Sequence, residues 1–166
     1  MIFEISPPIL YELGLDAAME WLAERLQEQQ GITVEVEFKG KERDGKGDLH
    51  TILFQAVREL LTNIRKHSQA KNVKIHVIRS KKEIKIAVQD DGVGFVPSSR
   101  RQKGSVRNFG LFNIEEQLKH IRGKFEIVSS PGKGTTVTLI APINSGKESG
   151  NRGSNGQTTP KNSAGR

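Results

Sequence analysis

Apolar side chains recur every three or four residues in three stretches of the chain, which is the spacing of an amphipathic helix. In the second stretch the apolar positions share one face of a helical wheel: Leu53, Val57, Leu60, Leu61 and Ile64. Gly31 and Gly123 follow the first and third stretches, as a glycine often does after a helix. The pattern therefore predicts three helices, over Leu15–Gln30, Leu53–Ala70 and Gly110–Ile121.

Five other stretches are short, rich in β-branched residues or alternately apolar and polar, as strands are. They are Ile32–Phe38, Val73–Arg79, Glu83–Gln89, Lys124–Ser129 and Thr135–Ala141. The order of elements predicts an α+β fold, a two-layer α/β sandwich whose mixed, mostly antiparallel sheet is covered by about three helices on one face. A doubly wound parallel fold would need helices and strands to alternate throughout.

The two ends of the chain differ from its middle. Residues 1–14 include Pro7 and Pro8 and are predicted to be an extended lead-in segment, and Pro97–Asn108 is predicted to be a polar loop. From Asn144 onward the composition is mostly Gly, Ser, Asn, Thr and Lys, which cannot form a core. We therefore expect one domain over residues 15–143 and a disordered tail or linker over residues 144–166.

Composition removes several classes of protein. The chain has 166 residues and no cysteine, so disulfides and thiolate metal sites are excluded. No apolar run approaches the roughly 18 residues of a membrane span, and the first residues lack the basic region of a secretory signal. A cytoplasmic location is expected.

The net charge of +7 is unevenly placed. Residues 144–166 carry four basic side chains and one acidic one, which leaves +4 for the rest of the chain. A basic protein can bind nucleic acid, an acidic membrane surface or an anionic small ligand. Because acidic residues are interleaved with the basic ones and aromatic residues are scarce, nucleic-acid binding is not expected as the main function.

A row of polar side chains runs beside the apolar face of the second predicted helix. Glu59, Asn63 and His67 follow one another at a step of four residues, with Lys66 close by. Such a row can face a ligand from one rigid element, although a solvated flank would look the same.

Three glycine-bearing turns follow this helix at the ends of strands or helices. They are Asp90-x-Gly92-x-Gly94, Asn108-Phe109-Gly110 and Gly132-x-Gly134-Thr135. A carboxylate at a strand end can accept a hydrogen bond from an exocyclic amine, and a helix N-terminus can bind phosphate. Each turn is also common in proteins without such a site.

In this order the polar row and the turns resemble the ATP-binding catalytic domain of bacterial sensor histidine kinases, in the GHKL ATPase superfamily with its Bergerat fold. Four segments carry the resemblance: Glu59–His67 (the N box), Asp90–Phe95 (the first glycine box), Phe109–Phe112 (the second) and Gly132–Thr135 (the third). The match covers about Ser6–Pro142. The sequence of the N-box helix is similar to that of the NarL-partner (DesK/NarX-like) branch. In that branch, Ser6–Leu15 resembles the stretch just after the dimerisation and phosphoacceptor helices.

The chain departs from the family pattern at two positions. Asn108 stands where the second box usually opens with glycine, and Asp91 stands where the first box usually has asparagine.

The resemblance implies that Mg²⁺ and ATP are bound by the four boxes. The ATP-binding residues would be Asn63, Lys66, His67, Asp90, Gly92, Gly94, Gly110, Leu111, Phe112, Gly132, Gly134 and Thr135. Asn63 would be the metal ligand, Glu59 the catalytic, base-like residue, and Asp90 the acceptor for the adenine amine with Gly94 beneath the ring.

The remaining implied roles concern the phosphates and the far side of the base. Lys66 and His67 would contact phosphate, and the second box would offer backbone N–H groups to it from a lid. Thr135 would close the adenine side of the pocket.

The implied reaction is phosphoryl transfer from ATP to a histidine on a dimerisation helix. His50, His67, His76 and His120 do not lie in a long amphipathic helix of phosphoacceptor character. We therefore expect the phosphoacceptor and dimerisation domain to be a separate partner, a response regulator to act downstream, and the isolated domain to be a monomer that cannot autophosphorylate.

Three other functions are compatible with the sequence. Two keep the fold: an anti-sigma-type serine kinase, and a regulatory module that binds nucleotide without transferring phosphate. The third is a nucleic-acid-binding domain, which salt-sensitive binding of duplex DNA by residues 1–142 would favour.

Overall fold

The computed structural model describes residues 8–41, 47–97 and 106–143. Its helices are α1 (Pro8–Gln30), α2 (Asp48–Asn63), the π-helical turn η1 (Ile64–Ser68) and α3 (Val106–His120). Its strands are β1 (Thr33–Lys39), β2 (Asn72–Arg79), β3 (Glu83–Asp90), β4 (Lys124–Ser129) and β5 (Thr135–Pro142). All five predicted strands are found within one residue of their predicted ends.

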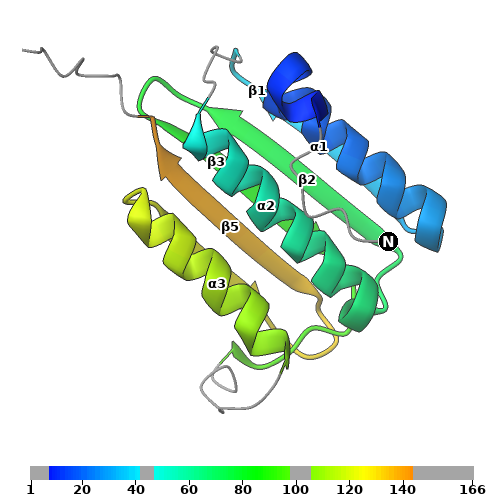
Figure 1. Cartoon of the computed structure of the whole chain (residues 1–166). Coiled ribbons are helices and arrows are strands. Elements are labelled where there is room, and N and C mark those ends of the chain that lie inside the picture. Colours follow the sequence, from blue (N-terminus) through cyan, green and yellow to red (C-terminus); the bar gives the residue numbers. More distant parts are fainter. Residues whose placement is uncertain (1–7, 42–46, 98–105, 144–166) are drawn as a thin grey trace, which may run out of the picture.

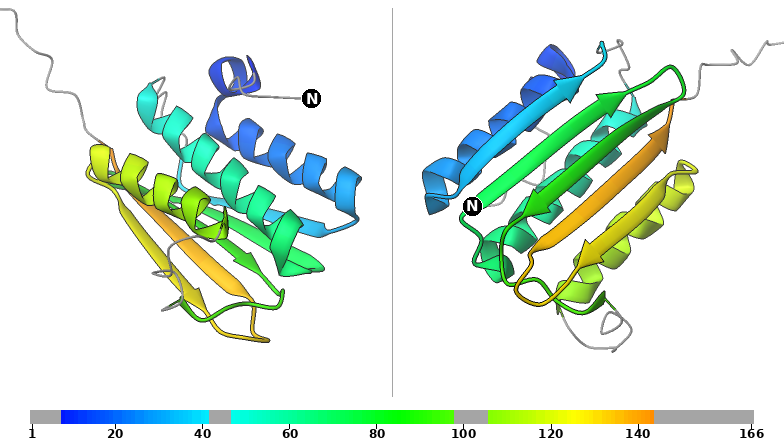
Figure 2. Two further views of the ribbon diagram at one scale, coloured as in Figure 1. Left: turned by 60° about the horizontal axis from the view of Figure 1, so that its bottom comes forward. Right: turned by 180° about the vertical axis from the view of Figure 1, so that it is seen from behind.

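The strands form one mixed sheet in the order β1-β2-β3-β5-β4. β1 is parallel to β2, and the other neighbours are antiparallel. The three helices lie on one face of the sheet, with α2 between α1 and α3, and the other face is open (Figures 1 and 2). The predicted fold class is confirmed.

The core fills the space between the helices and the sheet. Its fully buried large side chains come from both layers: Leu15, Met19, Leu53, Phe54, Val57, Val73, Ile75, Val77, Ile86, Leu118 and Leu139. Burying each such side chain contributes about 1.5–3 kcal/mol. α2 packs on the sheet through the apolar stripe seen in the sequence, and Glu59 of its polar flank lies against Gly110 of α3.

The prediction of an extended segment before Leu15 is wrong for residues 8–14, which are helical. Pro8 occupies the first position of α1, where its missing N–H group would have had no helical partner. The helix kinks at Gly14 (φ 91°, ψ −177°). After the kink Asp16 forms an ion pair with Arg79 at the end of β2, which ties the long part of α1 to the sheet. Residues 1–7 lie outside the described residues.

The other two helices begin earlier than predicted. α2 starts at Asp48, whose carboxylate suits the positive end of the helix dipole. α3 starts at Val106, within the predicted loop Pro97–Asn108, of which residues 98–105 are outside the described part. The predicted tail, residues 144–166, also lies outside it.

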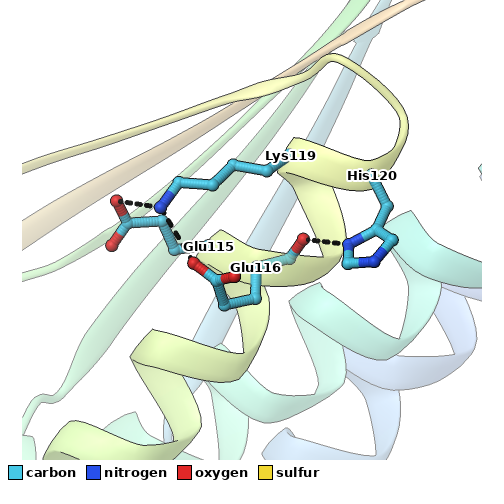
Figure 3. A network of polar contacts seen from close by, with 4 residues as sticks. All are labelled: Glu115, Glu116, Lys119 and His120. Carbon is cyan, nitrogen blue, oxygen red and sulfur yellow. Dashed lines mark hydrogen bonds and ion pairs between the residues drawn. The ribbon is translucent and has the colours of Figure 1, made fainter.

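The last turn of α3 carries a network of exposed polar groups (Figure 3). Lys119 Nζ lies 2.8 Å from Glu116 Oε1 and 3.5 Å from Glu115 Oε1, and the hydrogen bond to Glu116 raises the pKa of Lys119. His120 Nδ1 lies 2.8 Å from the carbonyl oxygen of Glu116. A cation near a helix C-terminus interacts favourably with the helix dipole, so Lys119 stabilises the end of α3.

Within the described ranges, no helix combines the length and the apolar character needed to cross a bilayer.

Candidate functional site

The C-terminal end of α2 and the start of α3 lie at the same end of the sheet (Figure 1). Residues of these elements and of the neighbouring strands line a pocket there. Its lining residues are Leu60, Asn63, Ile64, Ser68, Val88, Asp90, Gly94, Phe95, Leu111, Ile127, Thr135 and Val137. The cavity volume is about 50 Å³, which is room for only a few water molecules.

Asp90 supplies the carboxylate of this pocket. It is the last residue of β3, its side chain is buried, and its Oδ1 accepts a hydrogen bond from the N–H group of Gly92 (2.8 Å). Most of the surrounding side chains are apolar. A buried carboxylate in such walls can give direction and specificity to a flat ligand.

Asn63 supplies an amide at the end of α2. Its Nδ2 is buried, and in the described part of the chain no hydrogen-bond partner is found for it. Buried polar groups in proteins nearly always have a partner. An unsatisfied amide beside a pocket is therefore a group that a ligand can satisfy.

The π-helical turn η1 changes which side chains follow Asn63 along the site. In an α-helix, a step of five residues turns a side chain about 140° away, whereas the wider π turn brings residues i and i+5 together. Ser68 accordingly lines the pocket with Asn63. The predicted regular row of Glu59, Asn63 and His67 is interrupted at this turn.

Hydrogen bonds join the first and third glycine boxes behind the pocket. The N–H group of Gly132 donates to the carbonyl of Val93 (2.7 Å), and the N–H group of Val93 donates to the carbonyl of Ser68 (2.7 Å). The N–H group of Phe95 donates to Ser129 Oγ (2.9 Å). These hydrogen bonds hold the two turns and η1 in fixed positions around Asp90.

Asp91, the residue that replaces the usual asparagine, does not line the pocket. Its Oδ1 accepts from the N–H groups of Lys71 (2.8 Å) and Asn72 (2.9 Å), and its Oδ2 accepts from Asn72 Nδ2 (2.7 Å). The hydrogen bonds from Asn72 lower the pKa of Asp91. Asp91 thus fastens the first glycine box to the start of β2.

We expect Asp91→Asn to lower the free energy of unfolding by a small amount near neutral pH, because the carboxamide would set a donor against Asn72 Nδ2. The pKa of Asp91 is lower in the folded state, so its contribution is present above the ordinary value of 3.8 and is lost as the pH falls through and below that value. Denaturant unfolding of both proteins from pH 7 to pH 2.5 should show the difference shrinking at low pH. A difference that is constant with pH would contradict the carboxylate's role.

Glu59 lies outside the pocket lining, on the side of α2 that faces α3. A side chain at Gly110 would collide with Glu59 Oε1, so the lack of a Cβ lets the first turns of α3 rest on this carboxylate. Glu59 is half-buried at this contact.

Residues 48–145 match the family model described as histidine kinase-, DNA gyrase B- and HSP90-like ATPase. The chain belongs to this family. ATP is the substrate that membership in this ATPase family assigns to the domain.

Curated relatives of this chain are histidine kinases by name. An uncharacterised sensor-like histidine kinase of Chloroflexus aurantiacus is 35% identical over 87% of this chain and 25% of its own length. The histidine-protein kinase/phosphatase DegS of Brevibacillus brevis is 29% identical over 86% of this chain and 36% of its own. The chain therefore spans about a quarter to a third of the length of these relatives.

Solved histidine kinase structures share the fold. The mycobacterial sensor histidine kinase MprB aligns with a TM-score of 0.61 at 18% identity, over 77% of this chain and 93% of that one. The kinase AdeS of Acinetobacter baumannii aligns with a TM-score of 0.63 at 17% identity, over 78% and 64%. The recognition of the histidine kinase ATPase domain is confirmed, while the NarL-partner branch stays a prediction.

The pocket of this histidine kinase-like ATPase domain brings together five of the residues implied by the sequence: Asn63, Asp90, Gly94, Leu111 and Thr135. Three further residues, Gly92, Gly132 and Gly134, lie in the turns behind it. The prediction that the second glycine box offers free N–H groups at a helix N-terminus is wrong, because α3 begins at Val106 and the N–H groups of Gly110, Leu111 and Phe112 bond within the helix. Phe112 is exposed on α3, and Gly110 contacts Glu59.

Two residues of the N box are not part of the pocket wall. Lys66 is exposed and His67 is half-buried, both in η1. Their assignment to phosphate stays a prediction.

Sequence reasoning missed two serines of this site. Ser68 lines the pocket because of the π turn, and Ser129 bonds both glycine boxes from the end of β4. The sequence did contain a signal for Ser129, because alternation along β4 places this serine on the same face as the apolar Phe125 and Ile127. The period of the helix gave no such signal for Ser68.

Proposed function

We propose that this chain is the catalytic domain of a sensor histidine kinase, which binds Mg-ATP and supplies the γ-phosphoryl group to a histidine of a separate dimerisation domain in two-component signalling. The observation that carries the proposal is a buried carboxylate, Asp90, in an apolar pocket shared with the unsatisfied amide of Asn63. The apolar walls suit a flat purine, and Asp90 suits its exocyclic amine.

The phosphates would extend from the pocket past Asn63 toward α3. The cationic Lys66 and the imidazole of His67 follow Asn63 in η1, and the second glycine box, Gly110, Leu111 and Phe112, is on the facing helix. Phosphate attracts cations and charge-assisted donors, so this end of the site suits the triphosphate.

The donor set fits Mg²⁺ held mainly by the nucleotide. The described residues contain no cluster of three carboxylate or histidine ligands, and Asn63 offers one amide oxygen. Mg²⁺ keeps several waters and is commonly bound by few protein ligands together with phosphates. When bound, it would neutralise charge on the β- and γ-phosphates.

In the reaction, a nitrogen of the acceptor imidazole would bond to the γ-phosphorus. At the same time the bond between the γ-phosphorus and the oxygen that bridges the β- and γ-phosphates would break, and ADP would leave. The carboxylate of Glu59 would take the proton of the attacking imidazole. The protein's other contribution is positioning.

The acceptor histidine is assigned to another domain because those of this chain are poorly placed. His50 is buried in α2, His76 lies in β2 with Nδ1 3.5 Å from Glu37, and His120 bonds the end of α3. The fourth histidine, His67, lies in η1 and is assigned to the phosphates. We infer that the partners are a phosphoacceptor domain and a downstream response regulator, that the isolated domain is a monomer, and that it works in the cytoplasm where ATP is supplied.

The test is calorimetric titration of Mg-ATP into the parent protein and Asp90→Asn. The amide oxygen of asparagine can still accept from Gly92, but its NH₂ group would face the adenine amine. We expect the parent to bind and the variant to lose about 1–3 kcal/mol of binding free energy. Glu126→Gln, an exposed change on β4, is the matched control.

The result separates the proposal from its alternatives. If the folded parent binds Mg-ATP and Asp90→Asn binds it with the same affinity, Asp90 does not recognise adenine. If a folded parent does not bind, the chain is not an ATP-binding catalytic domain. Binding of Mg-ATP without transfer to a supplied phosphoacceptor domain would favour the regulatory module. Transfer to a serine of a partner would instead indicate an anti-sigma-type kinase.

A further inference from the structure

Ser129 lies one layer behind the pocket wall. It is the last residue of β4, it is buried, and its hydroxyl contacts three groups of the site. The N–H group of Phe95 lies 2.9 Å from Ser129 Oγ, the carbonyl oxygen of Gly134 lies at 3.1 Å, and Thr135 Oγ1 lies at 2.8 Å. Of these three residues, Phe95 and Thr135 line the pocket.

The direction of each hydrogen bond follows from counting protons. A serine hydroxyl has one proton and two lone pairs. The N–H group of Phe95 can only donate, so it takes one lone pair, and the carbonyl of Gly134 can only accept, so it takes the proton. The second lone pair is then left for the hydroxyl proton of Thr135. Thr135 therefore directs its proton toward Ser129 and offers only lone pairs to the pocket.

The hydroxyl of Ser68, which also lines the pocket, likewise has its proton engaged away from the pocket. Ser68 Oγ donates to the carbonyl of Ile64 (2.9 Å) and accepts from the N–H group of Ala70 (3.0 Å). The carboxylate of Asp90 also only accepts. Asp90 and Thr135 are paired across β3 and β5, so these acceptors stand side by side at one end of the pocket.

We infer that Ser129 is a positioning residue that fixes the proton of Thr135, so that Asp90 and Thr135 both present hydrogen-bond acceptors to the nucleobase, which favours the amino group of adenine over the carbonyl group of guanine. When the base docks with position 6 toward Asp90, adenine presents an amino donor there, whereas guanine in the same orientation presents a carbonyl acceptor. The inference rests on the proposed function, because it concerns the nucleobase end of the same site.

The test compares Ser129→Ala with Ser130→Ala, an exposed serine next to it in the chain. Calorimetry would give dissociation constants for Mg-ATP, Mg-GTP and Mg-tripolyphosphate, which lacks a base. In Ser129→Ala the Thr135 hydroxyl is released and can donate to the base. We expect ATP to bind about tenfold more weakly and the preference for ATP over GTP to fall about tenfold, with tripolyphosphate unchanged. Ser130→Ala should match the parent.

Three outcomes would overturn the inference. They are an unchanged ATP-to-GTP ratio in folded Ser129→Ala, an equal loss for tripolyphosphate, and the same effect in Ser130→Ala. If Ser129→Ala does not fold, Thr135→Val must show the reduced ratio, and an unchanged ratio there is equally contrary. A parent that binds neither nucleotide would contradict the proposed function itself, which the parent titration shows before any variant is compared.

Discussion

Replacing Glu59 with glutamine is expected to slow phosphoryl transfer to a histidine-bearing dimerisation domain by about 10²–10⁴-fold, the usual contribution of a positioned general base. Glutamine keeps the shape and the packing against Gly110 but cannot take a proton. Glu59 lies outside the pocket lining, so the change to glutamine removes no contact with the nucleotide. The dissociation constant for Mg-ATP should therefore change by less than about twofold.

The measurement is single-turnover transfer from labelled ATP to a phosphoacceptor domain of one of the relatives, supplied in trans at saturating nucleotide. Glu126→Gln makes the same chemical change on the open face of the sheet and should react at the parent rate. A parental rate in Glu59→Gln would show that the carboxylate serves only as a support for α3. A loss of Mg-ATP binding would place Glu59 in the nucleotide site instead.

The layers of the fold could be predicted because they follow from local periodicity. Leu53 and Val57 were placed on the buried face of a helix by their spacing, and both are fully buried. Strand ends were equally clear where polar turns interrupt β-branched runs. The N-terminal part of α1 was missed because Pro8 indicates an extended chain in sequence and yet is suited to the first position of a helix.

The finer geometry of the site could be predicted only in part. The resemblance placed Asp90 and Thr135 in one pocket, and the sheet pairs them. The π turn was not predictable, since apolar spacing does not distinguish it from the last turn of an α-helix. Ser129 joins the site through contacts with residues up to 34 positions away, which a pattern of neighbours does not contain.

Two glycines of the third box give the second large prediction, because they share a backbone conformation and differ in their surroundings. Gly132 has φ +76° and Gly134 has φ +73°, both in the left-handed region. A side chain at Gly132 would meet nothing within 4 Å, whereas one at Gly134 would collide with the carbonyl oxygen of Asp90. Gly132 is exposed and Gly134 is buried.

We expect Gly132→Ala to lower the free energy of unfolding by about 1–2 kcal/mol, the cost of the left-handed conformation alone. Gly134→Ala should lose about 3–5 kcal/mol, because the backbone collision is added and neither strand can move without breaking the pairing of Asp90 with Thr135. Denaturant unfolding of the two variants and the parent measures both losses.

The same collision links stability to nucleotide binding. Relief of the contact at Gly134 requires the end of β3 to shift, and that end carries the carboxylate of Asp90. Gly134→Ala, if folded at low temperature, should therefore bind Mg-ATP at least tenfold more weakly than Gly132→Ala, in which Asp90 is undisturbed. Equal losses of stability in the two variants would show that the turn, and not the approach to Asp90, requires glycine at position 134. Equal affinities would show that Asp90 keeps its place without the third box.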